Sequence, residues 1–286
     1  MSGRLVLVAT PIGNLGDLSP RAVETLRAAD IVCCEDTRHT RKLLSHADIR
    51  VERLMAVHQH NEASQAVSVV RWLDEGKVVA VVTDAGLPGI SDPGERLVAA
   101  AAAAGHIVEV VPGPSAVTAA LVVSGLPTER FSFEAFLPRK GAERARRLAA
   151  VAREERTIVM YEAPQRVAAT LVDLAASTCC GPQRRCAIVR EITKLHEETW
   201  RGTLAEAIAL GEAAAPLEPR GEHVIVVAGR PQTDASSDDV TAAVAEAMGS
   251  GLSVRDAAAE VAAALGVPKR QAYDAAMDLR RNANGV

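Results

Sequence analysis

The chain has 286 residues, of which 48% are hydrophobic but only 2% aromatic, and its formal net charge is −4. The core must therefore be built from Ala, Val and Leu, and a nucleic-acid surface made of stacked aromatic rings is disfavoured. Because the whole molecule is weakly acidic, any contact with nucleic acid has to use a local basic patch.

Residues 1–112 alternate short apolar strands with helices. Strands are predicted at Leu5–Ala9, Ile31–Cys34, Val78–Thr83 and Ile107–Val111. Helices are predicted from Pro20 to about Ala29, over Val67–Leu73, and from Asp92-Pro93 to about Ala104, with Ser19 and Asp92 as N-caps. This alternation predicts an α/β domain whose mostly parallel sheet carries helices on its faces.

A second α/β domain is predicted over residues 113–230. It begins with a helix at Ser115–Val123, and its strands are expected at Thr157–Tyr161, Ala187–Glu191 and Val224–Ala228. Residues 231–239 are polar and predict a linker. The remaining residues, 240–286, predict an Ala-rich helical extension in which a short Gly-containing turn joins two helices, as in a helix-turn-helix.

The five cysteines favour a reducing compartment. Their number is odd and no pair has CxxC spacing, which predicts neither a disulfide framework nor a zinc site. Cys33 and Cys34 lie in a strand-like run, where buried free thiols are expected. The N-terminus lacks a secretory signal, and no apolar run is long enough for a bilayer. We therefore expect a soluble cytoplasmic protein with no membrane contact.

Three loops rich in Gly and Pro each follow a predicted strand: Thr10–Asp17, Asp84–Gly94 and Pro112–Ala116. In open α/β sheets, ligands bind outside the carboxyl ends of the strands. The loops therefore predict one small-molecule site, although none has a GxGxxG or phosphate-loop pattern. Asp84 could accept hydrogen bonds from a ligand, and Ala85 and Gly86 would allow close approach. The alternatives are tight turns, an Asx-turn and helix caps.

Four polar clusters are further candidates. Glu35–Thr40 is either a cluster of side chains with a function or a solvated charged loop. Arg190–Glu198 is a second charged cluster after a strand. His58–Glu62 could place His58, His60 and Glu62 on one face of an extended segment, as a substrate surface, a metal site or nothing special. Residues 138–156 hold seven Arg or Lys against three Glu, which predicts phosphate contact or a solvated helix face.

These segments together resemble the tetrapyrrole methylase superfamily, whose enzymes use S-adenosylmethionine. Within it they resemble the branch that methylates the ribose 2′-oxygen of a cytidine in the decoding centre of 16S rRNA. The matching segments, in family order, are Thr10–Ala22, Glu35–Thr40, His60–Glu62, Asp84–Gly94, Val111–Ala116, Gly125–Lys140, Tyr161–Arg166, Arg190–Glu198 and Arg220–Val227. The loop at Asp84 departs from the GDP-type loop of many superfamily members, as expected of the RNA-modifying branch.

The resemblance implies that S-adenosylmethionine lies in the cleft between the two α/β domains. The cofactor residues implied are Pro11, Asp84, Ala85, Gly86, Ile90, Ser115, Ala116, Tyr161 and Glu162. It also implies a homodimer acting on 16S rRNA, within the small ribosomal subunit, and a helical C-terminal extension. We predict that this extension holds the substrate or packs on the methylase body.

Methyl transfer to a ribose hydroxyl requires alignment of the reactants and is helped by a base or a charge-stabilising group. Glu35 or Glu191 could accept the proton, and Lys194 or Arg38 could stabilise the developing negative charge or hold phosphate. Substrate contacts are expected from Asp36, His39, His58, His60, Asn61, Arg139, Lys140 and Arg190, and no metal is expected. Two competing functions are a methylase of a tetrapyrrole-like small molecule and a non-catalytic nucleic-acid-binding protein.

Overall fold

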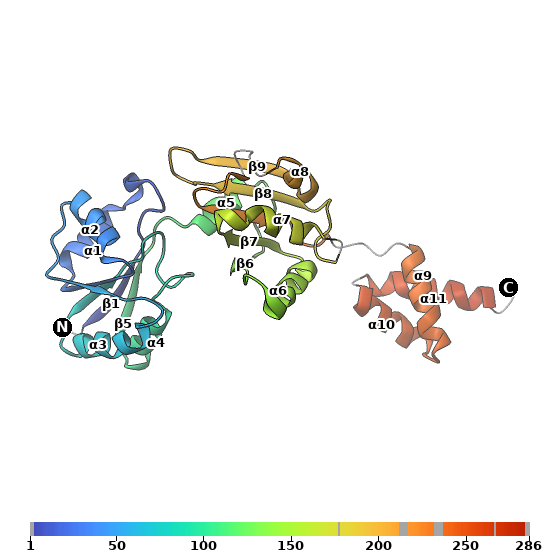
Figure 1. Cartoon of the computed structure of the whole chain (residues 1–286). Helices are drawn as coiled ribbons and strands as arrows, with labels where there is room; N and C mark the ends of the chain where they lie inside the picture. The colour runs from blue at the N-terminus through green and yellow to red at the C-terminus, as the bar shows by residue number, and fades with distance from the viewer. Residues whose placement is uncertain (1–2, 177, 212–216, 232–236, 266, 284–286) are drawn as a thin grey trace. The chain divides into compact units, whose positions relative to one another are not determined.

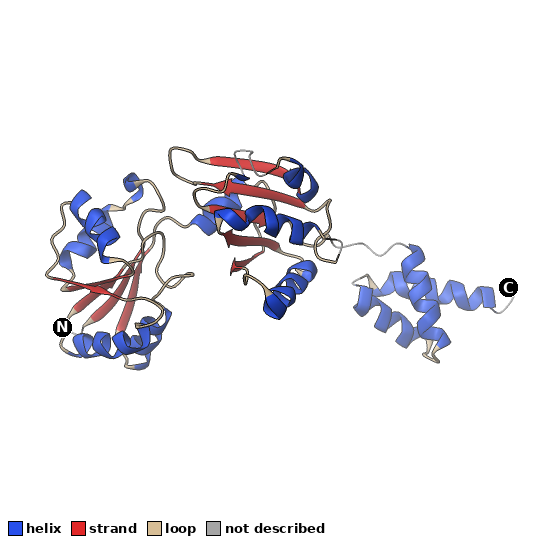
Figure 2. Ribbon diagram, in the orientation of Figure 1, coloured by secondary structure: helices blue, strands red, loops and turns tan. Residues whose placement is uncertain are grey.

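The computed structural model describes residues 3–176, 178–211, 217–231, 237–265 and 267–283. The chain divides into two compact units, Met1–Arg230 and Pro231–Val286. Two five-stranded sheets make up the first unit, and the second is helical (Figures 1 and 2). None of the helices in the described ranges is both long and apolar enough to cross a membrane.

The first sheet is entirely parallel, as the sequence predicted. Its strand order is β3-β2-β4-β1-β5, with β1 at Arg4–Val8, β2 at Ile31–Cys34, β3 at Arg53–Ala56, β4 at Val78–Val81 and β5 at Ile107–Val111. Its helices are α1 (Pro20–Ala28), α2 (Thr37–His46), α3 (Glu62–Asp74) and α4 (Glu95–Ala103), and a 3-10 turn spans Leu15–Asp17. Because all strands are parallel, every strand ends at the same edge of the sheet.

Apolar side chains of this sheet alternate between two cores. Leu5 packs with residues of α3 and α4, whereas the neighbouring Val6 packs with residues of α1. The two helix pairs lie on opposite faces of the sheet (Figure 1). This is the period of two expected for strands covered on both faces. Cys33 and Cys34 point to opposite cores and are buried free thiols, as predicted.

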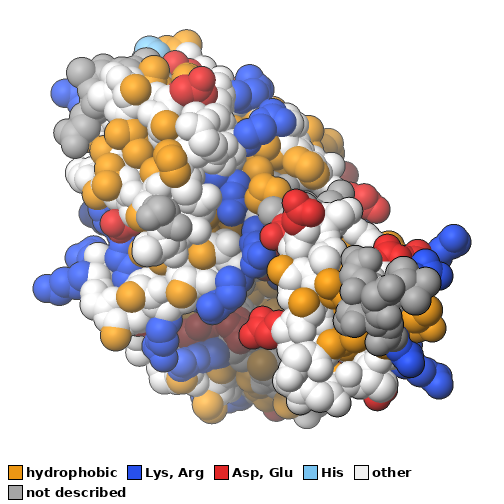
Figure 3. Space-filling view, turned by 90° about the vertical axis from the view of Figure 1, so that its right-hand side faces the viewer, with side chains coloured by type: hydrophobic (Ala, Val, Ile, Leu, Met, Phe, Trp, Pro, Cys, Tyr) orange, Lys and Arg blue, Asp and Glu red, His pale blue; other side chains and the backbone are white. Residues whose placement is uncertain are grey.

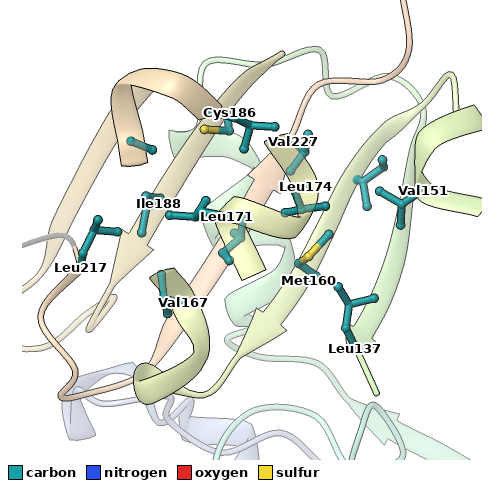
Figure 4. Close-up of a cluster of buried hydrophobic side chains, with 14 residues drawn as sticks. Leu137, Val151, Met160, Val167, Leu171, Leu174, Cys186, Ile188, Leu217 and Val227 are labelled. Carbon is teal, nitrogen blue, oxygen red and sulfur yellow. The ribbon is translucent and has the colours of Figure 1, made fainter. Parts of the chain in front are cut away.

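The second sheet is mixed, with the order β6-β7-β10-β8-β9. Strands β6 (Phe131–Phe136) and β7 (Thr157–Glu162) are parallel, whereas β10 (His223–Val227), β8 (Arg185–Arg190) and β9 (Glu198–Thr203) pair antiparallel. One face is covered by α7 (Val167–Ala175), whose apolar side chains meet those of β7, β8 and β10 (Figure 4). The other face packs against α5 (Ala116–Val123). The remaining helices are α6 (Gly141–Arg153), α8 (Leu204–Ala209) and a 3-10 turn at Pro164–Arg166.

The second unit contains α9 (Ser237–Gly249), α10 (Val254–Leu265) and α11 (Lys269–Ala283). Its own core combines Val240, Val244 and Val261 with small alanines. The helices of the extension are confirmed. The predicted linker at residues 231–239 was wrong in its last three residues, which form the first turn of α9, and residues 232–236 lie outside the described ranges. The boundary predicted near residue 112 falls between β5 and α5 and stays a prediction.

Four elements escaped the sequence analysis. The segment at Glu35–Thr40 is not a charged loop, because the Asp36 carboxylate accepts the Arg38 amide proton at 2.7 Å and caps α2, which starts at Thr37. Strands β3, β6 and β9 were missed because they are edge strands and only partly buried, which weakens their hydrophobic pattern. The parallel arrangement is found in the first sheet, whereas the second sheet is mixed.

Candidate active site

The three predicted loops converge at the carboxyl edge of the first sheet. Thr10 and Gly86 exchange both backbone hydrogen bonds, at 2.9 and 3.1 Å, and the Thr10 hydroxyl donates to the Thr83 carbonyl at 3.1 Å. The third loop packs against the first so closely that a Cβ on Gly113 would lie 2.8 Å from Ala9 Cβ. The loops therefore form one structure rather than three separate turns.

A cavity of about 370 Å³ opens between these loops and the second sheet. Its walls come from the first two loops, the start of α5, the carboxyl ends of β6 and β7, the loop after β8 and the beginning of β10. This volume lies within the range of small-molecule sites, which is roughly 300–1,000 Å³. The cleft predicted between two α/β halves is thus present.

Seven of the nine expected cofactor residues line this cavity: Ala85, Gly86, Ile90, Ser115, Ala116, Tyr161 and Glu162. Ser115 is the N-cap residue of α5, but its side chain makes no capping hydrogen bond. Pro11 and Asp84 are not among the lining residues. The Asp84 carboxylate instead contacts His39 Nδ1 at 3.0 Å and accepts the Asp36 amide proton at 3.3 Å.

Tyr161 is central to the wall supplied by the second sheet. Its ring packs edge-on against Phe133 at 5.0 Å between centroids, and Phe136 lies at 5.5 Å. Burial, followed by the negative charges of Asp92 and Glu222, raises the pKa of Tyr161 to about 12. The phenol is therefore a neutral hydrogen-bonding group at physiological pH.

The sequence analysis missed much of the cavity wall. The additional lining residues are Ile12, Leu87, Ser91, Asp92, Phe136, Ala163, Pro164, Val189, Ile192, Gly221, Glu222, His223 and Val224. Most are apolar residues of strands and adjoining turns that carry no chemical signal in the sequence. The segment Arg220–Val227, which helped to define the resemblance, was the one pointer to the β10 side of the wall.

The assignment of Asp92 as a helix N-cap was wrong. Helix α4 begins at Glu95 with Gly94 as its N-cap, and the amides of Gly94 and Arg96 donate to the buried Glu62 carboxylate at 2.8 and 3.0 Å. Because Glu62 satisfies this helix start, Asp92 faces the cavity. Burial, the nearby Glu35 carboxylate and Asp84 raise the pKa of Asp92 to about 6.

The interpretation of His58–Glu62 as an extended segment was also wrong. Glu62 begins α3 and is buried, whereas the rings of His58 and His60 meet edge-on with centroids 6.0 Å apart. Asn61 closes this turn by accepting the His58 amide proton at 2.8 Å and donating to the Ala56 carbonyl at 3.1 Å. In the part of the chain that the structure describes, no group of three His, Cys, Asp or Glu side chains could hold a metal.

A second polar cluster joins the two halves beside the cavity. Lys194 Nζ lies 2.8 Å from Glu191 Oε1 and 2.9 Å from Glu222 Oε2. The Lys194 stem crosses the first loop, where a Cβ on Gly13 would lie 2.4 Å from Lys194 Cγ. Burial raises the pKa of Glu191, but hydrogen bonds from Lys194 and the Glu222 amide outweigh this effect, so its pKa is lowered overall. Lys194 itself stays protonated.

The remaining expected site residues have varied surroundings. Arg38 is exposed and paired with Asp36 at 2.9 Å. Arg190 is buried, with hydrogen bonds to the Glu218 carboxylate at 2.7 Å and the Arg220 carbonyl at 3.1 Å. Arg139 and Lys140 are exposed just before α6.

The basic cluster around α6 is partly neutralised. Arg144, Arg147 and Arg156 form ion pairs with Asp173, Glu134 and Glu154 at 2.6–2.7 Å. More generally, basic and acidic side chains are interspersed with apolar ones on the face shown in Figure 3. The cations available to an outside partner are therefore a subset of those counted in the sequence.

A sequence profile of the tetrapyrrole (corrin/porphyrin) methylases matches residues 4–208, which contain both sheets. The chain belongs to this family. A profile described as the RsmI C-terminal HTH domain matches residues 234–280, the helical unit. S-adenosylmethionine is the cofactor of the methylase family, as the resemblance implied.

Curated relatives are similar over most of the chain. "Ribosomal RNA small subunit methyltransferase I" of Synechocystis is 45% identical over 280 residues, covering 97% of this chain and 98% of the relative. A protein of the same name from Thermotoga maritima is 44% identical over 228 residues, covering 80% of this chain but 99% of the relative. The Thermotoga maritima relative therefore matches four-fifths of this chain over nearly its own whole length.

A solved structure with the same fold is the uroporphyrin-III C-methyltransferase of Thermus thermophilus complexed with S-adenyl homocysteine. It has a TM-score of 0.52 and 22% identity, covering 79% of this chain and 96% of that chain. The fold class expected from the sequence is confirmed.

Proposed function

We propose that this protein transfers a methyl group from S-adenosylmethionine to the ribose 2′-oxygen of a cytidine in the decoding centre of 16S rRNA, at position 1402 in the usual rRNA numbering. The observation that carries the proposal is the similarity to ribosomal RNA small subunit methyltransferase I, which extends over nearly the whole chain. Of the charged segments that the resemblance placed in the RNA-modifying branch, Arg190–Glu198 supplies Ile192 to the cavity wall, and Glu35–Thr40 follows β2 at the same edge of the first sheet as the second loop.

The cavity suits the cofactor in size and lining. Small residues at Ala85, Gly86 and Ala116 let backbone groups approach a ligand, and Ile12 and Ile192 supply apolar walls. S-adenosylmethionine supplies a methyl group already activated by a sulfonium centre. The main task of the protein is then to align the acceptor oxygen, which can contribute on the order of 7–11 kcal/mol.

RNA would contact the polar carboxyl edge of the first sheet and the exposed cations before and within α6. His58 and His60 follow β3 and His39 lies in α2, whereas the basic residues Arg139, Lys140 and Arg146 are exposed. Such cations can neutralise phosphates. A macrocyclic small molecule, the competing substrate, has no need of an exposed basic group of this kind, so these residues favour RNA.

Among the expected catalytic groups, Lys194 is a candidate to stabilise negative charge because it is ion-paired with Glu222, which lines the cavity, and with Glu191. Glu191 is a weak candidate for the base. Its pKa is lowered, and its carboxylate already accepts hydrogen bonds from Lys194 and the Glu222 amide, so it has little tendency to take up a proton. Arg38 is exposed and suits phosphate binding better than charge stabilisation within the cavity.

The test is methyl transfer from labelled S-adenosylmethionine to small ribosomal subunits that lack this modification, with fully modified subunits as the control. Label on the 2′-oxygen of the decoding-centre cytidine is the expected result. Cofactor binding without RNA methylation would favour the small-molecule substrate, and nucleic-acid binding without methylation would favour the non-catalytic function.

The assembled small subunit as substrate, a homodimeric enzyme and a cytoplasmic location are further parts of the proposal. Comparing naked 16S rRNA with assembled subunits tests the first, and light scattering tests the second.

A further inference from the structure

Two carboxyl groups from distant segments meet at the wall of the cavity. Glu35 follows β2, and the Thr83 hydroxyl after β4 donates to Glu35 Oε2 at 3.2 Å. Asp92, from the loop before α4, lines the cavity and lies close enough to Thr83 and Glu35 for both side chains to affect its ionisation. Two carboxyl groups held close together oppose each other's ionisation.

The loop is shaped to hold Asp92 in this place. Ser91 has φ 65°, a left-handed conformation that a residue other than glycine adopts at a cost, and Gly94 has φ 144°. A Cβ on Gly94 would lie 3.0 Å from the Gly89 amide nitrogen, so the loop folds tightly on itself. Since Glu62 caps α4, the carboxylate of Asp92 is not needed for the helix.

The surroundings of Asp92 contain negative rather than positive charge. The largest charge effects on Asp92 come from Glu35 and Asp84, both negative, and Tyr161 lies within electrostatic range of it on the second sheet. Asp84 is itself held by His39. Two neighbouring carboxylates oppose each other's ionisation, and burial adds to this effect. Asp92 is therefore a stronger base than an ordinary aspartate.

We propose that Asp92 accepts the proton of the acceptor hydroxyl during methyl transfer, and that Glu35 is a positioning residue that acts through Asp92. This inference rests on the proposed function and deepens it. The hydroxyl oxygen forms its bond to the methyl carbon as the bond from that carbon to sulfur breaks. The electrons of the broken bond stay on sulfur, and the hydroxyl proton passes to the Asp92 carboxylate.

The geometry favours Asp92 over the two carboxylates suggested by sequence. Glu35 is not among the lining residues, and Glu191 is tied to Lys194. Asp92 both lines the cavity and has the environment of a base that operates near neutral pH, where general-base catalysis is most effective. Within the carboxyl pair, Asp92 contacts the substrate, and Glu35 changes the pKa of Asp92.

The first experiment is a carbon-13 NMR titration of the free protein labelled at its Asp and Glu carboxyls. We expect one carboxyl with a midpoint well above the usual aspartate range. Its signal should disappear in Asp92→Asn, and its midpoint should move to lower pH in Glu35→Gln. The control Glu191→Gln should leave it in place. A spectrum with no such carboxyl, or an unchanged midpoint in Glu35→Gln, overturns the pairing.

The second experiment measures single-turnover RNA methylation against pH, with cofactor binding measured by calorimetry in parallel. Asp92→Asn should lose on the order of 10²–10⁴-fold in rate while still binding cofactor. Glu35→Gln, which keeps Asp92, should shift the acidic limb of the profile to lower pH. A rate within a few-fold of wild type for Asp92→Asn, or no shift for Glu35→Gln, refutes the catalytic role.

The two experiments separate this inference from the proposed function. If wild-type protein transfers no methyl group to RNA, the proposed function fails, and the proton-acceptor role fails with it. The titration needs neither RNA nor cofactor, so it tests the carboxyl pair whatever the substrate is.

Discussion

Replacing Gly221 by alanine tests how the cavity rim is held together. Gly221 precedes β10 with φ 82°, and it lines the cavity. A Cβ at this position would lie 2.6 Å from Glu191 Cγ and 2.7 Å from Glu191 Oε1. The substitution therefore adds backbone strain and also displaces the carboxylate that anchors Lys194.

Backbone strain and displacement of Glu191 each lower the free energy of unfolding by an amount that can be worked out separately. Alanine in the left-handed region costs roughly 1–2 kcal/mol, of which about 0.4–1 kcal/mol is offset because the unfolded chain becomes less flexible. Glu191 Oε1 accepts hydrogen bonds from Lys194 Nζ and the Glu222 amide, both at 2.8 Å. A hydrogen bond to a charged group contributes about 1.5–3 kcal/mol, and partial exposure of Glu191 reduces this. The total is about 2–3 kcal/mol.

The assay is urea unfolding, with Gly105→Ala as the matched control. Gly105 has φ 79°, but a Cβ there has nothing within 4 Å, so only the strain of about 1 kcal/mol remains. The difference between the two variants isolates the displacement of Glu191. Weaker cofactor binding should accompany Gly221→Ala alone. Equal losses of stability in both variants would refute the reasoning.

Four further predictions follow from the same structure. Glu62→Ala should destabilise the protein by about 2–3 kcal/mol in urea, because it removes the acceptor of two buried amides, whereas the exposed Glu95→Ala should change stability by less than about 0.5 kcal/mol. The pKa of Asp92 is raised from 3.8 to about 6 on folding, so the native state binds more protons than the unfolded state between these values, and its stability should fall as pH rises through that window. Urea unfolding at a series of pH values should show this loss, and Asp92→Asn should remove it. Reversing the charges of Arg139, Lys140 and Arg146 should weaken RNA binding and flatten its salt dependence without unfolding the protein, whereas Arg144→Ala, which breaks the contact to Asp173, should lower the melting temperature. Deleting residues 231–286 should leave the first unit folded and able to bind cofactor while reducing RNA methylation, and loss of cofactor binding by the truncated protein would contradict this.

Local patterns were sufficient for most of the fold. The start of α1 could be predicted because Ser19 and Pro20 satisfy a helix terminus through residues that are neighbours in the sequence. The Ser19 side chain does accept the Ala22 amide proton. The apolar runs of β1, β2 and β4 were equally clear, since a parallel strand buried on both faces is a continuous hydrophobic stretch; β5 was found from its apolar sequence although it is an edge strand and mostly exposed. Edge strands such as β9, which are half exposed, lack this signal.

For the site, the sequence by itself determined the three loops and the charged clusters at Glu35–Thr40 and Arg190–Glu198, because strand ends with Gly, Pro and charged residues mark ligand-binding edges through their local chemistry. Only the tertiary structure decided what the individual side chains do. Asp92 looked like a helix cap until Glu62, from another helix, was found to fill that role, and it then became the partner of Glu35. The physical reason is that hydrogen bonding and burial depend on neighbours brought together by folding. A carboxylate's pKa therefore belongs to its three-dimensional surroundings and not to its place in the chain.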